Sequence, residues 1–127
     1  MKKILVASTL VVGLLGSAGA FADATVICGG GAAGPGTVPT SGTAGTHFML
    51  TPIAPKCSAN TNVAGVDGTS GAWYAVGANS VKGKNNYAGN TNGGSVAVTV
   101  ACAVPGGCTA AESVTARGVA NTAASSS

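Results

Sequence analysis

The stretch SVAVTVACAVPGGCTAAE, residues 95–112, contains the clearest secondary-structure signals of the chain. In residues 95–104, valine or cysteine alternates with alanine, serine or threonine, which predicts a half-buried β-strand with its valines on the covered face. Cys102 lies on the same face as these valines. The Pro-Gly-Gly sequence that follows predicts a tight turn, and such a turn lets Cys102 reach Cys108.

The last four residues of this stretch match a helix start. Thr109 and Glu112 have the spacing of a capping box, in which each side chain accepts a hydrogen bond from the other residue's backbone N–H. This pattern favours a short helix over residues 110–117. The alternative is a final strand over residues 113–116, and Gly118 is expected to end either element.

Two glycine-containing dipeptides upstream predict hairpin turns. Asn-Gly at 92–93 precedes the strand at 95–104, and Asp-Gly at 67–68 separates two β-prone segments, 63–66 and 72–76. Such dipeptides adopt the positive φ angles of tight turns between antiparallel strands. The middle of the chain is therefore predicted to form an antiparallel meander.

Two further strands are predicted nearer the N-terminus. The first is residues 24–28, and the second is the apolar segment 46–53, which contains Pro52 and is followed by Pro55. Between them, the Gly/Pro/Thr/Ser-rich residues 29–45 are predicted to be a flexible loop. The predicted fold class is mainly β: a small disulfide-bonded antiparallel β-sandwich or meander with long Gly/Thr/Ser loops and, if the capping box is used, one short C-terminal helix.

The N-terminus has the three parts of a secretory signal peptide. Lys2 and Lys3 precede the apolar residues 4–15, and a small-residue cleavage site follows at 20–22. The apolar stretch is shorter than the roughly 20 residues that span a bilayer as a helix. We therefore predict a signal peptide at residues 1–22 that is removed, leaving no stable membrane anchor.

The exported part is predicted to be one small β-rich domain, residues 23–120, with a disordered tail at 121–127. Gly, Ala, Thr, Ser and Asn make up 68 of its 105 residues, whereas Leu, Ile, Val and Phe make up 16. Such a chain buries little apolar surface, while each ordered residue costs about 1–2 kcal/mol of backbone entropy. We expect its stability to depend on disulfides or on association with neighbours.

All four cysteines lie in the exported part, where two disulfides are expected. They allow three pairings, of which the sequence favours Cys28 with Cys57 and Cys102 with Cys108. No metal site is predicted, because there is no Cys-x-x-Cys pair and the only histidine, His47, is distant in sequence from every cysteine. Four basic and three acidic residues remain after cleavage, a formal net charge of +1 without a basic cluster, so nucleic acid is not an expected partner.

Catalysis and cofactor binding are not expected. The only histidine and the only acidic residues after residue 22 are His47, Asp23, Asp67 and Glu112. None lies in a pattern typical of a nucleophile or an acid–base pair. Residues 29–34 match the letters of a dinucleotide-binding loop, but prolines follow where that site needs a helix. We predict that the protein is not an enzyme and has no cofactor.

The candidate binding residues are the aromatic side chains Trp73, Tyr74 and Tyr87. Trp73 and Tyr74 are adjacent in a predicted strand, so one is expected in the core and the other outside, and Trp73 as a core residue is the favoured interpretation. Tyr87 lies in the asparagine-rich segment 84–92, which is expected to be a loop suited to stacking on sugars or packing at an interface.

Low charge, small residues and a thin core favour one class of function. We predict an exported structural or surface-associated protein, a self-associating fibre or matrix subunit, located in the periplasm, at the cell surface or outside the cell. Its expected partners are further copies of itself or other envelope proteins. The alternative is a small extracytoplasmic binding module for carbohydrate or for an envelope protein.

Overall fold

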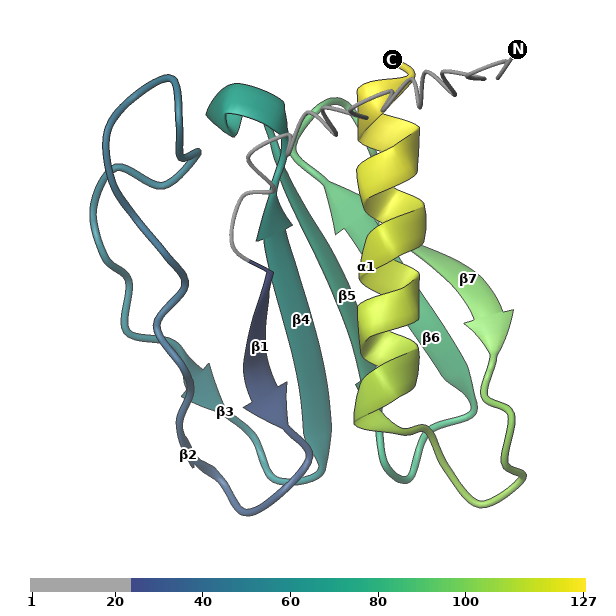
Figure 1. The fold of residues 1–127 in the computed structure, drawn as a ribbon. Coiled ribbons are helices and arrows are strands. Elements are labelled where there is room, and N and C mark those ends of the chain that lie inside the picture. Colours follow the sequence, from purple (N-terminus) through teal and green to yellow (C-terminus); the bar gives the residue numbers. More distant parts are fainter. Residues whose placement is uncertain (1–23) are drawn as a thin grey trace, which may run out of the picture.

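A five-stranded antiparallel sheet is the central layer of the protein (Figure 1). The structure is a computed structural model that describes residues 24–127, so the predicted signal peptide lies outside the described residues. In spatial order the strands of the sheet are β1 (Thr25–Gly29), β4 (Thr61–Asp67), β5 (Tyr74–Ser80), β6 (Asn85–Asn90) and β7 (Ala97–Ala101). The other elements are a small antiparallel sheet of β2 (Gly34–Pro35) and β3 (Lys56–Cys57), a 3-10 turn (Thr69–Gly71) and the helix α1 (Ala110–Ser125).

The order of the strands confirms the predicted meander. Strands β4 to β7 follow one another in the chain and pair with their neighbours in antiparallel fashion, while β1 pairs with the outer edge of β4. Segment 29–45, the predicted loop, contains β2 and is held in part by backbone hydrogen bonds, from Gly36 N–H to the Pro55 carbonyl and from Thr37 N–H to the Ile27 carbonyl, each 2.9 Å. The fold is mainly β with two disulfides and one C-terminal helix, as predicted.

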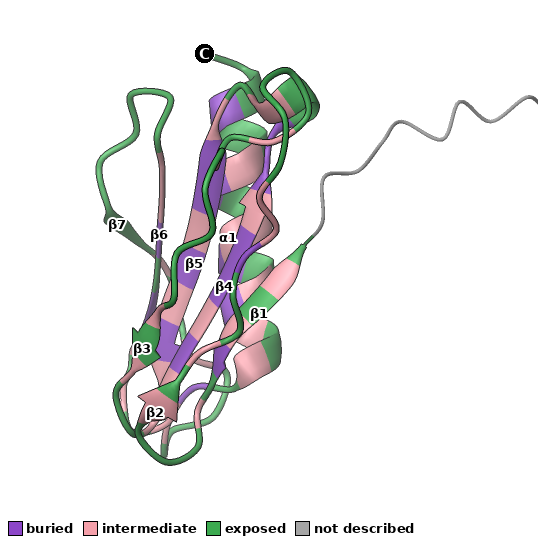
Figure 2. Ribbon diagram, turned by 90° about the vertical axis from the view of Figure 1, so that its left-hand side faces the viewer, coloured by how far each residue is buried: buried purple, intermediate pink, exposed green. Residues whose placement is uncertain are grey.

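The two faces of the sheet are covered differently. Helix α1 packs across β4, β5 and β6 on one face, as Figures 1 and 2 show. On the other side, residues 36–55 lie beside β1 and β4 (Figure 1), and at one end of β4 and β5 the Phe48 N–H donates to Asp67 Oδ1 at 3.0 Å and the Phe48 ring lies 6.4 Å from that of Tyr74. This second cover does not extend over β6 and β7, so the sheet keeps one partly open face.

Small residues form the interface between the sheet and the helix. Ala64, Gly77 and Ala88 are paired across β4, β5 and β6 and are buried beneath α1. The helix contributes the buried residues Ala116, Ala120 and Ala124. A β-carbon at Gly77 would overlap the helix backbone at Ser113 and Arg117. The alanine- and glycine-rich composition therefore brings the helix backbone close to the sheet.

A chain of buried amides lies beside this interface. Asn62 Nδ2 donates to Asn79 Oδ1, and Asn79 Nδ2 donates to Asn86 Oδ1, each at 2.7 Å. Asn79 Nδ2 also donates to the Thr109 carbonyl at 2.8 Å, just before α1 begins. All three asparagines are at most 5% exposed. Because a buried amide is costly unless it is hydrogen-bonded, this row of linked asparagines fixes the register of three strands and the position of the helix start.

Two sequence-based predictions, one for residues 46–53 and one for residues 67–68, were wrong. Residues 46–53 form no strand, because prolines remove backbone donors there and the Phe48 N–H is bonded to the Asp67 carboxylate. The Asp-Gly dipeptide at 67–68 is not a hairpin turn. Asp67 is the last residue of β4, paired with Tyr74 and 3% exposed, and the 3-10 turn makes the connection.

The helix is longer than predicted. The capping box at Thr109 and Glu112 is confirmed, but Gly118 lies inside α1, and residues 121–125, predicted to be a disordered tail, are helical. Tertiary contacts outweigh the low helix propensity of glycine here. Ala120 and Ala124 are buried, and their carbonyls accept hydrogen bonds from the side-chain amides of Asn90 (3.1 Å) and Asn92 (2.8 Å). The Trp73 indole N–H donates to Asn121 Oδ1 at 2.9 Å.

The predicted strand at 95–104 forms as β7, but its valines are not covered. Val96, Val98 and Val100 are 77%, 54% and 56% exposed. Strand β7 is the edge of the sheet, beyond the area covered by α1 or residues 36–55. The register also shifts between Val98 and Val100, which interrupts the alternation of faces. The sequence pattern identified the strand correctly but not its place in the sheet.

The favoured disulfide pairing is confirmed. Cys28 in β1 is bonded to Cys57 in β3, and Cys102 after β7 is bonded to Cys108 before α1, with Cα–Cα distances of 5.7 and 5.0 Å. The first bond ties the main sheet to the small sheet. The second ties the edge strand to the helix start, across a turn in which the Gly107 N–H donates to the Val104 carbonyl at 3.2 Å.

The two disulfides are expected to contribute unequally to stability. The paired cysteines are separated by 29 and 6 residues in the sequence. The lower entropy of the cross-linked unfolded chain then stabilises the fold by about 3.6 kcal/mol for Cys28–Cys57 and about 2.3 kcal/mol for Cys102–Cys108. Replacing Cys28 and Cys57 together by alanine should lower the free energy of unfolding by more than replacing Cys102 and Cys108. Urea denaturation of the two double variants measures this difference, and the reverse order would contradict the entropic explanation.

Glu112 organises the start of the helix. Its carboxylate accepts hydrogen bonds from the backbone N–H groups of Ala103 (2.7 Å) and Thr109 (2.6 Å). These hydrogen bonds lower the pKa of Glu112 below its ordinary value of 4.5, and the bond from Ala103 has the largest effect. The carboxylate thus holds the loop of the second disulfide onto the first turn of α1.

A pH dependence of stability follows from this carboxylate. Because the pKa of Glu112 is lower in the folded state than in the unfolded state, its contribution is present above pH 4.5 and is lost as the pH falls through the lowered value. Glu112→Gln should therefore have a lower Tm than the parent protein at pH 7, and the difference should vanish in acid. Thermal melts of both proteins across this range test the expectation. A Tm difference independent of pH would show that the charge of Glu112 does not matter.

Candidate functional site

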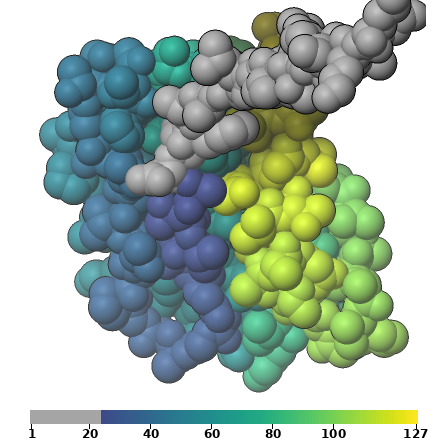
Figure 3. Space-filling model, in the orientation of Figure 1, coloured from purple at the N-terminus to yellow at the C-terminus, as the bar shows by residue number. Residues whose placement is uncertain are grey.

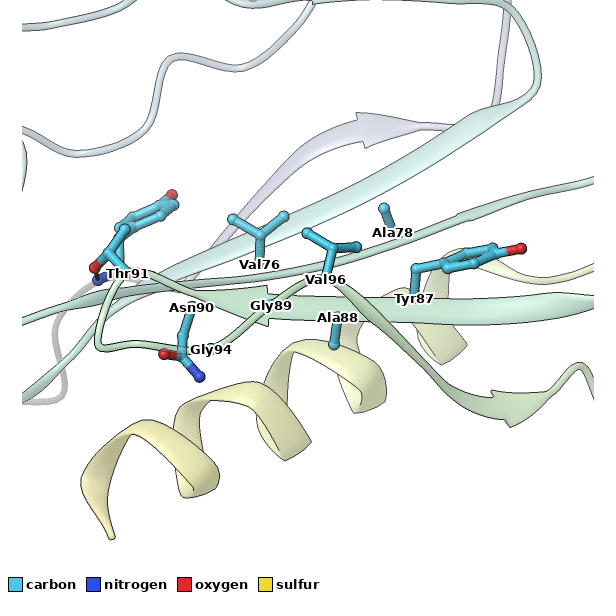
Figure 4. A pocket seen from close by; sticks show the side chains of 10 residues that line it. Val76, Ala78, Tyr87, Ala88, Gly89, Asn90, Thr91, Gly94 and Val96 are labelled. Atoms are coloured by element: carbon cyan, nitrogen blue, oxygen red, sulfur yellow. Dashed lines mark hydrogen bonds between the residues drawn. The ribbon is translucent and has the colours of Figure 1, made fainter. Parts of the chain in front are cut away.

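The open part of the sheet face holds a shallow apolar cavity of about 300 Å³, here called the apolar bay. Figure 4 shows Val76, Ala78 and Val96 lining it between Thr91 at one end and Tyr87 at the other. The turn after β6, with Gly93 at φ +83°, returns the chain so that Val96 lies against Gly89, where a β-carbon would come within 3.0 Å of the valine. The absence of a side chain at Gly89 therefore keeps this part of the face hollow.

A second cavity, of about 430 Å³, adjoins the apolar bay on the side of the β5–β6 hairpin and is here called the polar bay. It shares Ala78 and Tyr87 with the apolar bay. Its remaining lining residues are mostly of polar type, although apolar atoms make up most of the accessible lining surface: Thr61, Asn79, Ser80, Gly83, Lys84 and Asn85. The Tyr87 side chain thus lies between an apolar and a polar cavity on the same sheet face.

The structure separates the three candidate binding residues. Trp73 is partly buried and packs against the alanine core under α1, in agreement with its favoured interpretation. Tyr74 points to the opposite face, as predicted, but is only 9% exposed, because Phe48 covers it and its ring lies over Gly65. Tyr74 lines one end of the apolar bay, but of the three candidates Tyr87, at 43% exposed, has the most accessible side chain.

Tyr74 is not suited to proton transfer. Burial, and secondly the negative charge of Asp67, raise the pKa of Tyr74 to about 12, against the opposing charge of Arg117. The phenol is therefore neutral at physiological pH, and its hydroxyl has no hydrogen-bond partner among residues 24–127. Tyr74 serves as a large packing residue under the 36–55 segment.

Tyr87 lies in a strand, not in the predicted loop, and this decides what surrounds it. In β6, Asn86, Ala88 and Asn90 belong to the helix-facing row of the sheet. Tyr87 and its alternate neighbours Asn85 and Gly89 belong to the open-face row. The asparagine-rich composition of this segment suggested a loop, and its sequence has no alternation of apolar and polar residues that would have predicted the strand.

Edge strand β7 is the second exposed feature. Its outer edge has no partner strand among the described residues, and Figure 3 shows this part of the chain along the outside of the molecule beside α1. The opposite edge of the sheet, β1, is different, because the Ile27 carbonyl there already accepts the Thr37 N–H. The sheet therefore has one open edge and one edge that is partly occupied.

No hydrogen bond or ion pair of the described residues joins His47, Asp67 and Glu112 to one another. Asp67 is buried under the 36–55 segment, Glu112 caps α1, and the His47 ring lies next to the Thr46 hydroxyl at 3.0 Å. Within residues 24–127 no three histidine, cysteine or acidic side chains are close enough to hold a metal ion. The site that the fold builds is a surface groove and an open strand edge.

Two disulfides indicate that the protein occupies an oxidising, extracytoplasmic environment. No helix of the described chain is both long and apolar enough to cross a bilayer. Comparisons with protein-family models, with curated proteins and with solved structures found no match to this chain.

Proposed function

We propose that this protein is an exported, surface-associated structural protein that associates with further copies of itself, as a subunit of a fibre or matrix. The observation that carries the proposal is the open edge strand β7, on which Val98 and Val100 are more than half exposed. Soluble monomers usually protect such an edge with charged side chains or proline. Strand β7 contains only alanine, valine and threonine.

The thin core supports the same proposal. The buried apolar residues of the described chain are mostly alanines, so folding of one copy removes little apolar surface from water. Pairing β7 with β7 of a second copy would extend the sheet and remove exposed valine surface on both chains. Such association would add to the stability of each copy through mass action.

The two edge strands of the sheet, β1 and β7, limit how copies of the protein can assemble. Two β7 edges that pair are identical surfaces, and this kind of contact closes into a two-fold dimer. Because the β1 edge is partly occupied by Thr37, growth beyond the dimer requires another surface. The apolar bay is the exposed apolar hollow suited to this second contact.

A matched pair of valine variants tests the self-association. Val98 in β7 and Val119 on the outer side of α1 are 54% and 52% exposed, so Val119→Lys controls for the added charge. Sedimentation velocity over a wide concentration range should show oligomers for the parent protein and for Val119→Lys, and monomers for Val98→Lys. A parent protein that stays monomeric at every concentration would overturn the proposal.

The proposed location is tested separately. The protein is expected in the periplasm, at the cell surface or in the medium, in disulfide-bonded form. Fractionation of cells and medium, followed by non-reducing mass analysis of each fraction, would locate it and identify its disulfides. Recovery of the protein only from the cytoplasm, with free thiols, would contradict the proposal.

A further inference from the structure

We propose that the polar bay is a binding site for an acidic polysaccharide, a sugar chain that carries carboxylate groups. The proposal does not depend on the pairing of β7 proposed above, because no residue of β7 lines the polar bay, although Ala78 and Tyr87 line both bays. It is carried by three features of the bay: an exposed aromatic ring, polar side chains without hydrogen-bond partners, and one lysine without a salt bridge.

Tyr87 supplies the aromatic ring. Its side chain is 43% exposed and lies at the junction of the two bays, and Figure 4 shows it extending along β6 away from Thr91. The apolar face of a sugar ring can stack on a tyrosine ring while its hydroxyl groups remain free to form hydrogen bonds. Ala78, which lines both bays, leaves room above the sheet beside the ring.

The hydrogen-bonding groups lie on the hairpin side of Tyr87. Lys84 and Asn85 line the polar bay together with Thr61, and in the described part of the chain neither the Lys84 ammonium nor the Asn85 amide has a hydrogen-bond partner or a salt bridge. An ammonium, an amide and a hydroxyl match the hydroxyl and carboxylate groups of a uronic acid. Asn79 also lines the bay, but its amide is engaged in the buried chain.

The surface charge favours an anionic ligand. The lysines of the described chain, Lys56, Lys82 and Lys84, are all exposed, whereas Asp67 is buried and Glu112 is bound to the helix cap. No acidic residue of the described chain lines the polar bay, so none competes there with a ligand for Lys84. The charge is too small and too scattered for nucleic acid, which needs many phosphate contacts along a basic surface. A polysaccharide with one carboxylate per sugar needs only one well-placed cation in each site.

Affinity electrophoresis of the purified disulfide-bonded protein tests the proposal, with polygalacturonate as the acidic probe, dextran as the neutral probe and single-stranded DNA as the phosphate probe. At 0.15 M salt we expect retardation by polygalacturonate and none by dextran or DNA. Lys84→Glu and Tyr87→Ala should each weaken the binding about tenfold or more, because a charged hydrogen bond or a stacked ring is lost.

Two further lysine variants separate a site from general charge attraction. Lys82→Glu and Lys56→Glu make the same charge change outside the bay, and each should alter the affinity by less than about threefold at this salt concentration. Tyr87→Phe keeps the ring and should retain most of the binding. The proposal is overturned if polygalacturonate is not bound, if dextran or DNA is retarded as strongly, or if all three lysine variants lose affinity equally. Sedimentation of Lys84→Glu shows independently whether self-association persists.

Discussion

Gly77→Ala is expected to destabilise the protein by about 3 kcal/mol or more. A β-carbon at this position would overlap the backbone of α1 at Ser113 and Arg117. Side chains can rotate away from an added methyl group, but a helix backbone must move as a whole. The whole of α1 would have to shift away from β5, which would loosen its alanine contacts along the sheet.

Gly118→Ala is the matched control for this prediction. Gly118 lies within α1, and a β-carbon there would meet nothing within 4 Å. Because alanine favours the helix, this change should stabilise the protein by about 1 kcal/mol. Thermal melts should therefore move in opposite directions, with Gly77→Ala lowering Tm by about 12 °C or more. Equal Tm values for Gly77→Ala and the parent protein would refute the close contact between helix and sheet.

Asn79→Ala is the second change with a large expected effect, a loss of about 3–5 kcal/mol. The Asn79 side chain accepts a hydrogen bond from Asn62 and donates to Asn86 and to the Thr109 carbonyl. Removing it leaves the buried amides of Asn62 and Asn86 and the partly buried Thr109 carbonyl without this partner, and each buried unsatisfied group costs about 1–3 kcal/mol. For a domain with so small a core, a loss of this size is a large part of the total stability.

Asn85→Ala is the control for the buried amide. Asn85 is only six residues away, in β6, but its side chain lies on the open face, and its removal should change stability by no more than about 0.5 kcal/mol. Urea denaturation of Asn79→Ala and Asn85→Ala compares the loss of an asparagine side chain within the buried row of asparagines with the same loss on the open face of the sheet. Similar losses in both would contradict a structural role for the Asn62–Asn79–Asn86 chain.

The candidate site was only partly predictable from sequence. Tyr87 was identified as a possible binding residue because it is one of the few aromatic residues and lies in an asparagine-rich segment, and the structure places it in a groove. Lys84 and Asn85 lie beside it only because β5 and β6 form a hairpin. Tyr74 was a candidate on the same grounds, yet Phe48, 26 residues earlier, covers it. That contact has no counterpart in the local sequence.

The sequence by itself determined the features that depend on neighbouring residues: the strand that became β7, the Cys102–Cys108 turn, and the capping box at Thr109 and Glu112. Only the tertiary structure decided which face of each strand is covered. It left Val98 exposed and buried Asn79 instead, because α1 can approach the sheet only along its alanines and glycines. Close approach needs small side chains, and amides are buried where they find partners. Both conditions depend on contacts between residues far apart in the chain.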